Sequence, residues 1–188
     1  MEKVKRILVP VDFSKRSREG LRFADSLAEE FGAGLVVLYV LSEQRFARDL
    51  FTRSIFLSDG PGAIAVPKPL PVDKLLEDAA LDLYRFIEST LSPGQLARLK
   101  PVRKLAIGKA REEVPRVAIQ EKADLIVLAS SEPSFISRAF TRDLGSFLAW
   151  RAPCSVLFIG KKGEWLGRYR GILRRLADFW QGLKLREA

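Results

Sequence analysis

Four short runs of aliphatic residues constrain the fold of this chain more than any other feature of its sequence. They read RILVPV, LVVLYVL, DLIVLAS and SVLFIG, and none of them alternates regularly between apolar and polar positions. Continuous hydrophobicity over so few residues is typical of strands that are buried on both faces, as in parallel sheets. We therefore expect a sheet with a layer of helices on each side.

Segments with helical periodicity separate these runs. After the first run, Ser14 is suited to cap a helix, and apolar residues recur at helical spacing from Leu21 to Phe31. The same spacing returns from Val72 to Ile87, before a fifth and half-exposed strand, VRKLAIG, and again from about Ala110 to Lys122. This order predicts an α/β fold, a three-layer and doubly wound sheet of five parallel strands with right-handed crossovers.

Two segments stand apart from this pattern, which places one domain over residues 1–160 and an extension over residues 161–188. Inside the domain, residues 42–71 form a long connection rich in glycine and proline, a length typical of functional or mobile loops. Its part from Gln44 to Leu57 mixes apolar side chains with arginines and predicts a short helix. That helix either covers a ligand cleft or faces a partner.

The extension carries eight basic and three acidic residues, so it holds +5 of the net charge of +9. Its apolar residues fall on helical spacing; they are Trp165, Tyr169, Ile172, Leu173, Leu176, Phe179, Trp180 and Leu183. This pattern predicts a basic amphipathic helix whose apolar face must be covered. The cover is its own core, a second subunit, an anionic membrane surface, or a nucleic acid or other partner, and the breadth of the aromatic stripe favours the second subunit.

Composition excludes several classes of function. The chain has no histidine and one cysteine, Cys154, which excludes Ser-His-Asp and Cys-His nucleophile systems, most zinc sites and an internal disulfide. It contains neither a Walker sequence nor GxGxxG, so we expect no enzymatic turnover. No signal peptide is visible, and no apolar run approaches the roughly 20 residues of a bilayer span, which predicts a cytoplasmic protein.

Three stretches, taken together and in order, resemble the universal stress protein family. They are RILVPVDFS, then LAEEFGAGLVVLYVL, then ADLIVLAS followed by LGSFLAWRAPCSVLFIG, and the resemblance extends from Lys5 to Gly160. It implies an adenine nucleotide alpha hydrolase-like fold, ATP binding in some members, and a dimer formed through the last strand. Because SVLFIG is expected at a sheet edge with unpaired backbone groups, edge pairing favours the same homodimer.

Ligands of such sheets bind beyond the carboxyl ends of the strands, where the strand order reverses. The resemblance implies that Asp12 lies there beside an adenosine and that the backbone near Val40 contacts the base. The expected cofactor-binding residues are Val11, Asp12, Val40, Ala129, Ser130, Arg138, Arg142, Gly145 and Ser146. An alternative role for Asp12 is to help cap the first helix.

The phosphate loop departs from the family pattern G-x-x-G-x9-G-S/T. Depending on the alignment, its two leading glycines are replaced by Glu132 and Phe135 or by Ala129 and Glu132. Side chains at these positions keep peptide N–H groups away from an anion, and a glutamate repels it.

Other residues of the same segment offer compensation. Arg138 and Arg142 supply positive charge, unless both are simply solvated, and Gly145-Ser146 are expected to begin a short helix whose N-terminus favours anions. Three alternatives follow. The site binds no physiological nucleotide, it binds ATP or AMP in a modified way, or it binds another anion. These alternatives predict a regulatory or interaction protein with a degenerate nucleotide loop or, alternatively, an ATP- or AMP-binding stress regulator.

Overall fold

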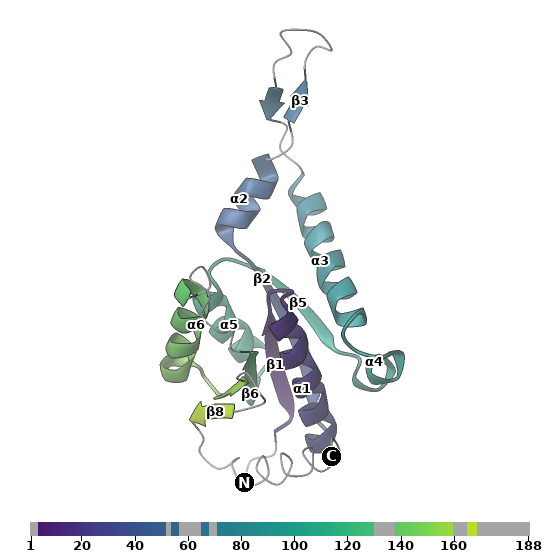
Figure 1. Cartoon of the computed structure of the whole chain (residues 1–188), viewed down its shortest axis with the longest axis vertical. Coiled ribbons are helices and arrows are strands. Elements are labelled where there is room, and N and C mark those ends of the chain that lie inside the picture. Colours follow the sequence, from purple (N-terminus) through teal and green to yellow (C-terminus); the bar gives the residue numbers. More distant parts are fainter. Residues whose placement is uncertain are drawn as a thin grey trace.

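A computed structural model describes residues 4–51, 54–56, 65–67, 71–129, 138–159 and 165–168. Its main sheet contains the five expected parallel strands, which are β1 (Arg6–Val11), β2 (Gly34–Leu41), β5 (Val102–Ile107), β6 (Leu125–Ala129) and β7 (Ser155–Ile159). They lie in the order β5-β2-β1-β6-β7, with a further strand beyond β7 (Figure 1). The prediction of a doubly wound, five-stranded parallel sheet is confirmed.

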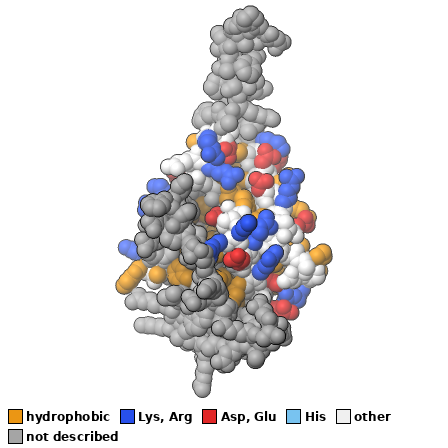
Figure 2. Space-filling model, in the orientation of Figure 1, with side chains coloured by type: hydrophobic (Ala, Val, Ile, Leu, Met, Phe, Trp, Pro, Cys, Tyr) orange, Lys and Arg blue, Asp and Glu red, His pale blue; other side chains and the backbone are white. Residues whose placement is uncertain are grey.

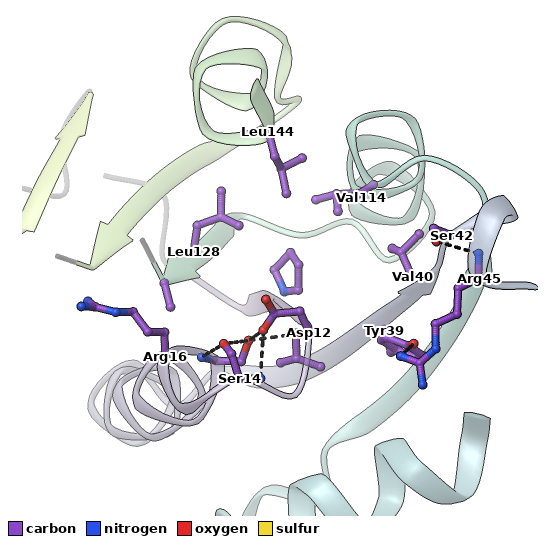
Figure 3. A pocket seen from close by; sticks show the side chains of 15 residues that line it. Asp12, Ser14, Arg16, Tyr39, Val40, Ser42, Arg45, Val114, Leu128 and Leu144 are labelled. Carbon is purple, nitrogen blue, oxygen red and sulfur yellow. Dashed lines mark hydrogen bonds between the residues drawn. The ribbon is translucent and has the colours of Figure 1, made fainter. Parts of the chain in front are cut away.

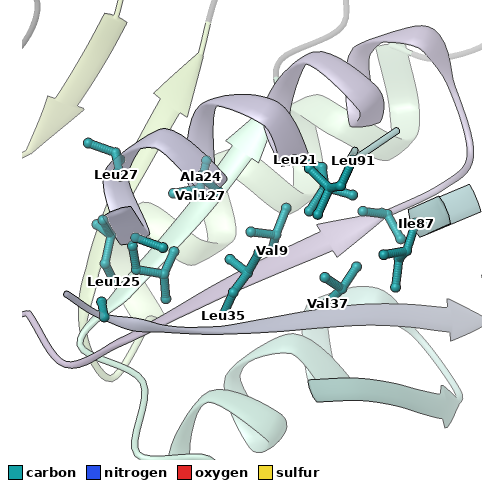
Figure 4. Packing of buried hydrophobic residues seen from close by; sticks show 14 of the residues in the cluster. Val9, Leu21, Ala24, Leu27, Leu35, Val37, Ile87, Leu91, Leu125 and Val127 are labelled. Carbon is teal, nitrogen blue, oxygen red and sulfur yellow. The ribbon is translucent and has the colours of Figure 1, made fainter. Parts of the chain in front are cut away.

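Helices cover both faces of this sheet. They are α1 (Lys15–Phe31), α3 (Val72–Glu88), α4 (Pro93–Leu99), α5 (Ala110–Gln120) and α6 (Arg138–Arg151). Buried residues of α1 and α3 form one apolar cluster with Val9 and Val37 of the sheet (Figure 4), and those of α5 and α6 form another with Leu8 and Leu38. Successive strand residues thus enter opposite clusters, as the pleat of a strand requires.

No helix in the described part of the chain is long and apolar enough to cross a bilayer. The cytoplasmic location remains a prediction.

Local sequence determines where the helices begin and end. The Ser14 Oγ accepts a hydrogen bond from the Ser17 amide at 3.1 Å and caps α1, as expected. Gly32 ends the same helix with a φ of 61°, a conformation that glycine adopts without steric cost. Ser92 and Gln95 begin α4 with a capping box.

Asp124 anchors β6 to β1, although the two strands are far apart in the sequence. Its Oδ2 accepts hydrogen bonds from the amides of Lys5 at 2.8 Å and Arg6 at 2.9 Å, and its own amide donates to the Arg6 carbonyl at 2.9 Å. The Cα pairs that follow are Ile7 with Leu125 and Leu8 with Ile126. The carboxylate therefore sets the register of the sheet at its centre.

The strand β8 (Trp165–Arg168) corrects two expectations. It pairs with β7 in antiparallel orientation, with Ile159 opposite Trp165 and Val156 opposite Arg168. The expectation that β7 lies at the sheet edge is therefore wrong, because β8 of the same chain satisfies the backbone groups that an edge would leave unpaired. Trp165, expected on the amphipathic helix, lies in a strand instead, and residues 169–188 of that predicted helix lie outside the described residues.

The long connection contains regular structure. Its first part forms α2 (Glu43–Phe51), which confirms the expected short helix, and the Ser42 Oγ accepts a hydrogen bond from the Arg45 amide at 3.2 Å at its start. Two short strands, β3 (Ser54–Phe56) and β4 (Ala65–Pro67), then pair in antiparallel orientation. Figure 1 shows α2, the first turns of α3 and this pair projecting from the carboxyl edge of the main sheet.

Charges of both signs share the described surface. On the face seen in Figure 2, basic and acidic side chains lie close to one another below the projection. Ion pairs such as Lys74 with Asp78, at 3.0 Å between Nζ and Oδ1, contribute to this mixture. The described surface on this face therefore carries no single large basic patch.

The buried strands predict a large difference between two leucine truncations. Leu8→Ala on β1, where the side chain is 0% exposed, should lower the free energy of unfolding by about 2–5 kcal/mol, because it leaves a cavity between packed layers. Leu81→Ala on α3, where the side chain is 42% exposed, is the matched control and should cost less than about 1 kcal/mol. Urea denaturation of both variants tests this, and equal losses would contradict the layer assignment.

Candidate functional site

A cavity of about 230 Å³ opens at the carboxyl edge of the main sheet. It is lined by Pro10, Val11, Asp12, Ser14, Arg16, Ser17, Tyr39, Val40, Ser42, Arg45, Ala110, Val114, Leu128, Ala129 and Leu144 (Figure 3). These residues come from β1, β2, β6 and the helices α1, α2, α5 and α6. The cavity thus lies where the strand order reverses, which is the position that ligands occupy in sheets of this kind.

The pairing of β1 explains why the cavity forms at this place. β1 pairs with β2 along its whole length, from Arg6 to Val11, but with β6 only at Ile7 and Leu8. Pro10 lies two residues beyond the last pair and has no N–H to donate to a neighbouring strand. The strands β1 and β6 therefore separate toward their carboxyl ends, and the side chains beyond the last pair line the space between them.

Asp12 stands at the end of β1 and belongs to a compact hydrogen-bond network. Its Oδ1 accepts from the Ser14 amide at 3.1 Å and from the Ser17 hydroxyl, and its amide donates to the Ser17 Oγ at 3.0 Å. The alternative that Asp12 supports the cap of α1 is therefore confirmed by these contacts. The same carboxylate lines the cavity, so support of the helix and contact with a ligand are compatible.

The network also controls the ionisation of Asp12. Partial burial raises the pKa of its carboxyl. The hydrogen bonds from Ser14 and Ser17 together lower the pKa by more than burial raises it, so the pKa lies below the usual 3.8. The group is therefore a carboxylate at neutral pH. Such a group accepts hydrogen bonds from hydroxyl or amino groups of a ligand.

Phe13, between Asp12 and the cap, has an unusual backbone. Its φ is 65°, a left-handed conformation that costs a side-chain-bearing residue about 1–2 kcal/mol. The Phe13 ring packs at a tilt against two other rings, with its centroid 4.3 Å from that of Tyr39 and 5.3 Å from that of Phe86. This packing holds the turn so that Asp12 and Ser14 both face the cavity, and strained residues of this kind are common at functional sites.

The start of α2 closes another side of the cavity. The Arg45 Nη1 donates to the Tyr39 hydroxyl at 2.8 Å, and its Nε lies 3.4 Å from the Asp49 Oδ2. Burial raises the pKa of the Tyr39 hydroxyl, although the positive charge of Arg45 acts in the opposite direction. Since Ser42 and Arg45 both line the cavity, the arrangement agrees with the expectation that this helix covers a cleft.

Apolar side chains form the opposite wall. They are Val40 on β2, Val114 on α5, Leu128 on β6 and Leu144 on α6, and Figure 3 shows them on one side of the cavity facing the polar groups of β1 and α1. A wall of this kind suits a flat, weakly polar ring. The cavity therefore combines an apolar half with a half that carries hydroxyls, a carboxylate and guanidinium groups.

The structure brings together part of the expected site. Val11, Asp12, Val40 and Ala129 all line the cavity, as the positions of the strand ends predicted. Ser130 and the two positions with Glu132 and Phe135 lie outside the described residues. Whether these residues hold a cofactor remains a prediction.

The helix α6 differs from expectation. It begins at Arg138, so Gly145 lies inside the helix instead of at its start. A Cβ at Gly145 would lie 3.1 Å from the Phe158 Cε1, which means that the glycine allows α6 to pack closely on β7. Ser146, Arg138 and Arg142 also belong to this helix, but their side chains lie outside the described ones.

Sequence reasoning missed several lining residues, above all Arg16 and Arg45. Both belong to the first turns of helices that start at strand ends, and this position is the signal that would have identified them. Val114 and Leu144 gave no comparable signal, because only the packing of α5 and α6 brings them to the cavity. Among the described residues, no group of three or more potential metal-binding side chains is present.

Comparison with known proteins adds evidence on the family. The model of the universal stress protein family matches residues 3–52 and 61–160. No curated protein sequence matches the chain.

Solved structures agree with the fold. A universal stress protein from Lactobacillus plantarum is 20% identical, with a TM-score of 0.53, and the match covers 84% of this chain and 99% of the other. A universal stress family protein from Burkholderia pseudomallei is 21% identical, with a TM-score of 0.53 and coverage of 85% and 98%. A universal stress protein in complex with cAMP is 15% identical, with a TM-score of 0.52 and coverage of 85% and 98%. At these identities the matches show a shared fold.

The lowered pKa of Asp12 predicts a specific dependence of stability on pH. A depressed carboxyl pKa contributes stability above the unfolded value, near 3.8, and the contribution is lost as the pH falls through the lower folded value. Asp12→Ala should therefore be less stable than the wild type at pH 5–7, and the difference should shrink below about pH 4. Urea denaturation across this range measures it, and a difference that grows toward acid pH would refute the assignment.

Proposed function

Because the chain belongs to the universal stress protein family, we propose that it is a regulatory protein that binds an adenine nucleoside or nucleotide in this cavity and does not turn it over. ATP and AMP are the ligands that the family suggests. The binding unit is the cavity between β1, β2 and β6, and the regulated output is contact with other protein chains.

The observation that carries this proposal is the meeting of Asp12, Val40 and Ala129 around one cavity. Apolar side chains from α5, α6 and β6 suit the faces of a purine ring, and the Asp12 carboxylate suits the hydroxyls of a ribose. The ends of β1, β2 and β6 supply Asp12, Val40 and Ala129, so these three residues are held by the central sheet. One protein of the same fold is described in complex with cAMP, which supports an adenine nucleotide as the class of ligand.

The phosphate groups contribute less to binding than the nucleoside in this proposal. The glycines that let peptide N–H groups approach a phosphate are replaced in the sequence, and Gly145 serves packing against Phe158. The loop is thus degenerate with respect to phosphate, while the nucleoside half of the site is retained. This unites the two functions that the sequence left open.

The chemistry of the cavity favours binding over catalysis. A general acid or base works best when its pKa lies near the working pH, whereas the hydrogen bonds to Asp12 keep its carboxyl pKa below 3.8. The chain also has no histidine to take this role. The ligand is therefore a signal in this proposal, and slow ATP hydrolysis is not its function.

Calorimetric titration with adenosine, AMP and ATP tests the nucleoside site. Asp12→Ala should weaken the binding of all three ligands by at least about fivefold, since it removes a charged hydrogen-bond acceptor. Ser92→Ala is a matched control, because it removes the cap of α4 away from the cavity and should leave affinity unchanged. Absence of binding to the wild type at millimolar ligand would refute the proposed function.

We also propose that the chain works as a homodimer, with a further protein as its regulated partner. β8 already pairs with β7, so a second copy would meet the outer edge of β8 and the extension that follows it. A membrane surface and a nucleic acid are less favoured partners for the extension, and the described face in Figure 2 carries charges of both signs. Light scattering of the full chain should give twice the chain mass of 21.1 kDa at micromolar concentration, and a monomer mass would contradict the dimer.

A further inference from the structure

We infer that Arg16 binds the anionic group of the ligand and replaces the lost phosphate loop in this task. The inference rests on the proposed function, since it concerns the same cavity. It assigns the site to a nucleoside that carries a phosphate, as opposed to a free nucleoside. It places that phosphate on the β6 side of the cavity.

Close packing of α1 on β6 provides the position. A Cβ at Gly20 would lie 3.0 Å from the Ala129 Cβ, so the missing side chain lets the helix approach the end of this strand. Arg16 precedes Gly20 by four residues and lies on the same face of the helix, about 6 Å nearer its N-terminus. Because α1 starts at the carboxyl edge of the sheet, Arg16 stands just beyond the last residue of β6.

The direction of the side chain agrees with this position. Helical side chains point toward the N-terminus of their helix. For α1 this direction leads past the carboxyl edge of the sheet, where the strands end. Arg16 lines the cavity, and Figure 3 shows it on the same side as Leu128, whereas Arg45 lies on the other side next to Tyr39. The two guanidinium groups therefore flank the cavity at opposite ends.

Position distinguishes the two arginines among the described lining residues. Arg45, on α2, lies 3.4 Å from the Asp49 carboxylate and donates to the Tyr39 hydroxyl of β2, so it stands on the β2 side of the cavity. The Oδ1 of Asp12, the one carboxylate among the described lining residues, accepts from Ser14 and Ser17 of the cap. Of these two described arginines, Arg16 is the one that α1 places at the β6 side.

Elementary chemistry connects this geometry with a phosphate. A guanidinium group offers a planar fork of donors that matches two phosphate oxygens, and such charge-assisted hydrogen bonds are about twice as strong as neutral ones. The first turn of α1 adds the partial positive charge of a helix N-terminus to the same place. A single side chain of this kind substitutes for backbone N–H groups that glycine would otherwise have exposed.

Affinity for AMP relative to adenosine measures the contribution of Arg16. By calorimetry at moderate salt, the wild type should bind AMP at least about fivefold more tightly than adenosine, because of one charge-assisted contact. Arg16→Ala should reduce this ratio to near one while adenosine affinity stays within about twofold, and Arg16→Lys should retain part of it. Lys15→Ala is the matched control, since it removes an exposed positive charge at the neighbouring position and should leave the ratio unchanged.

The outcomes separate this inference from the proposed function. If adenosine binds but the wild type shows no preference for AMP, or if Arg16→Ala retains the preference, the inference is overturned and the nucleoside site stands. If neither adenosine nor AMP binds the wild type, both are overturned. Thermal unfolding of each variant confirms that it is folded, and Arg16→Lys keeps the test decisive if Arg16→Ala does not fold.

Discussion

The short parallel contact between β1 and β6 is the interaction on which the rest of the structure depends. It joins the two halves of the doubly wound sheet, and the Asp124 carboxylate fixes its register through the amides of Lys5 and Arg6. The contact ends after Leu8, whereas the pairing of β1 with β2 continues to Val11. One central strand thus holds the sheet together at one end and opens a cavity at the other.

Most of the fold follows from the sequence because its strands are buried on both faces. Continuous apolar runs and helical periodicity predicted five parallel strands and the helices around them except α4, and the pattern of Gln44 to Leu57 predicted α2. The strand β8 was missed because four residues, WLGR, are too few for any periodicity, and their conformation depends on the neighbouring edge of β7. The start of α6 was missed because Gly145 was interpreted as a boundary, whereas its small size serves contact with Phe158.

The candidate site was predictable to the extent that strand ends define it. Val11, Asp12, Val40 and Ala129 each lie within one residue of the end of a strand, and parallel strands bring such residues to one edge regardless of what the helices do. Val114 and Leu144 instead reach the cavity through the packing of helices, which depends on contacts such as that of Gly145 with Phe158. A single sequence does not contain those distances. The hydrogen bonds of Asp12 with Ser14 and Ser17 are an intermediate case, since the cap was expected and the pKa it produces was not.

The cavity walls come from strands that are far apart in the sequence, and this has a consequence for the lifetime of the protein. Lys5 and Asp124, which close the contact of β1 with β6, lie 119 positions apart, so β1 leaves the ribosome long before β6 is available. A ligand that needs residues of both strands binds the completed fold and not a partial one, and its binding free energy adds directly to the stability of that fold. An abundant ligand would thereby protect finished molecules from proteolysis while unfinished or damaged ones remain open to it. Under the proposed function, the lifetime of the protein in a cell would then follow the concentration of its ligand.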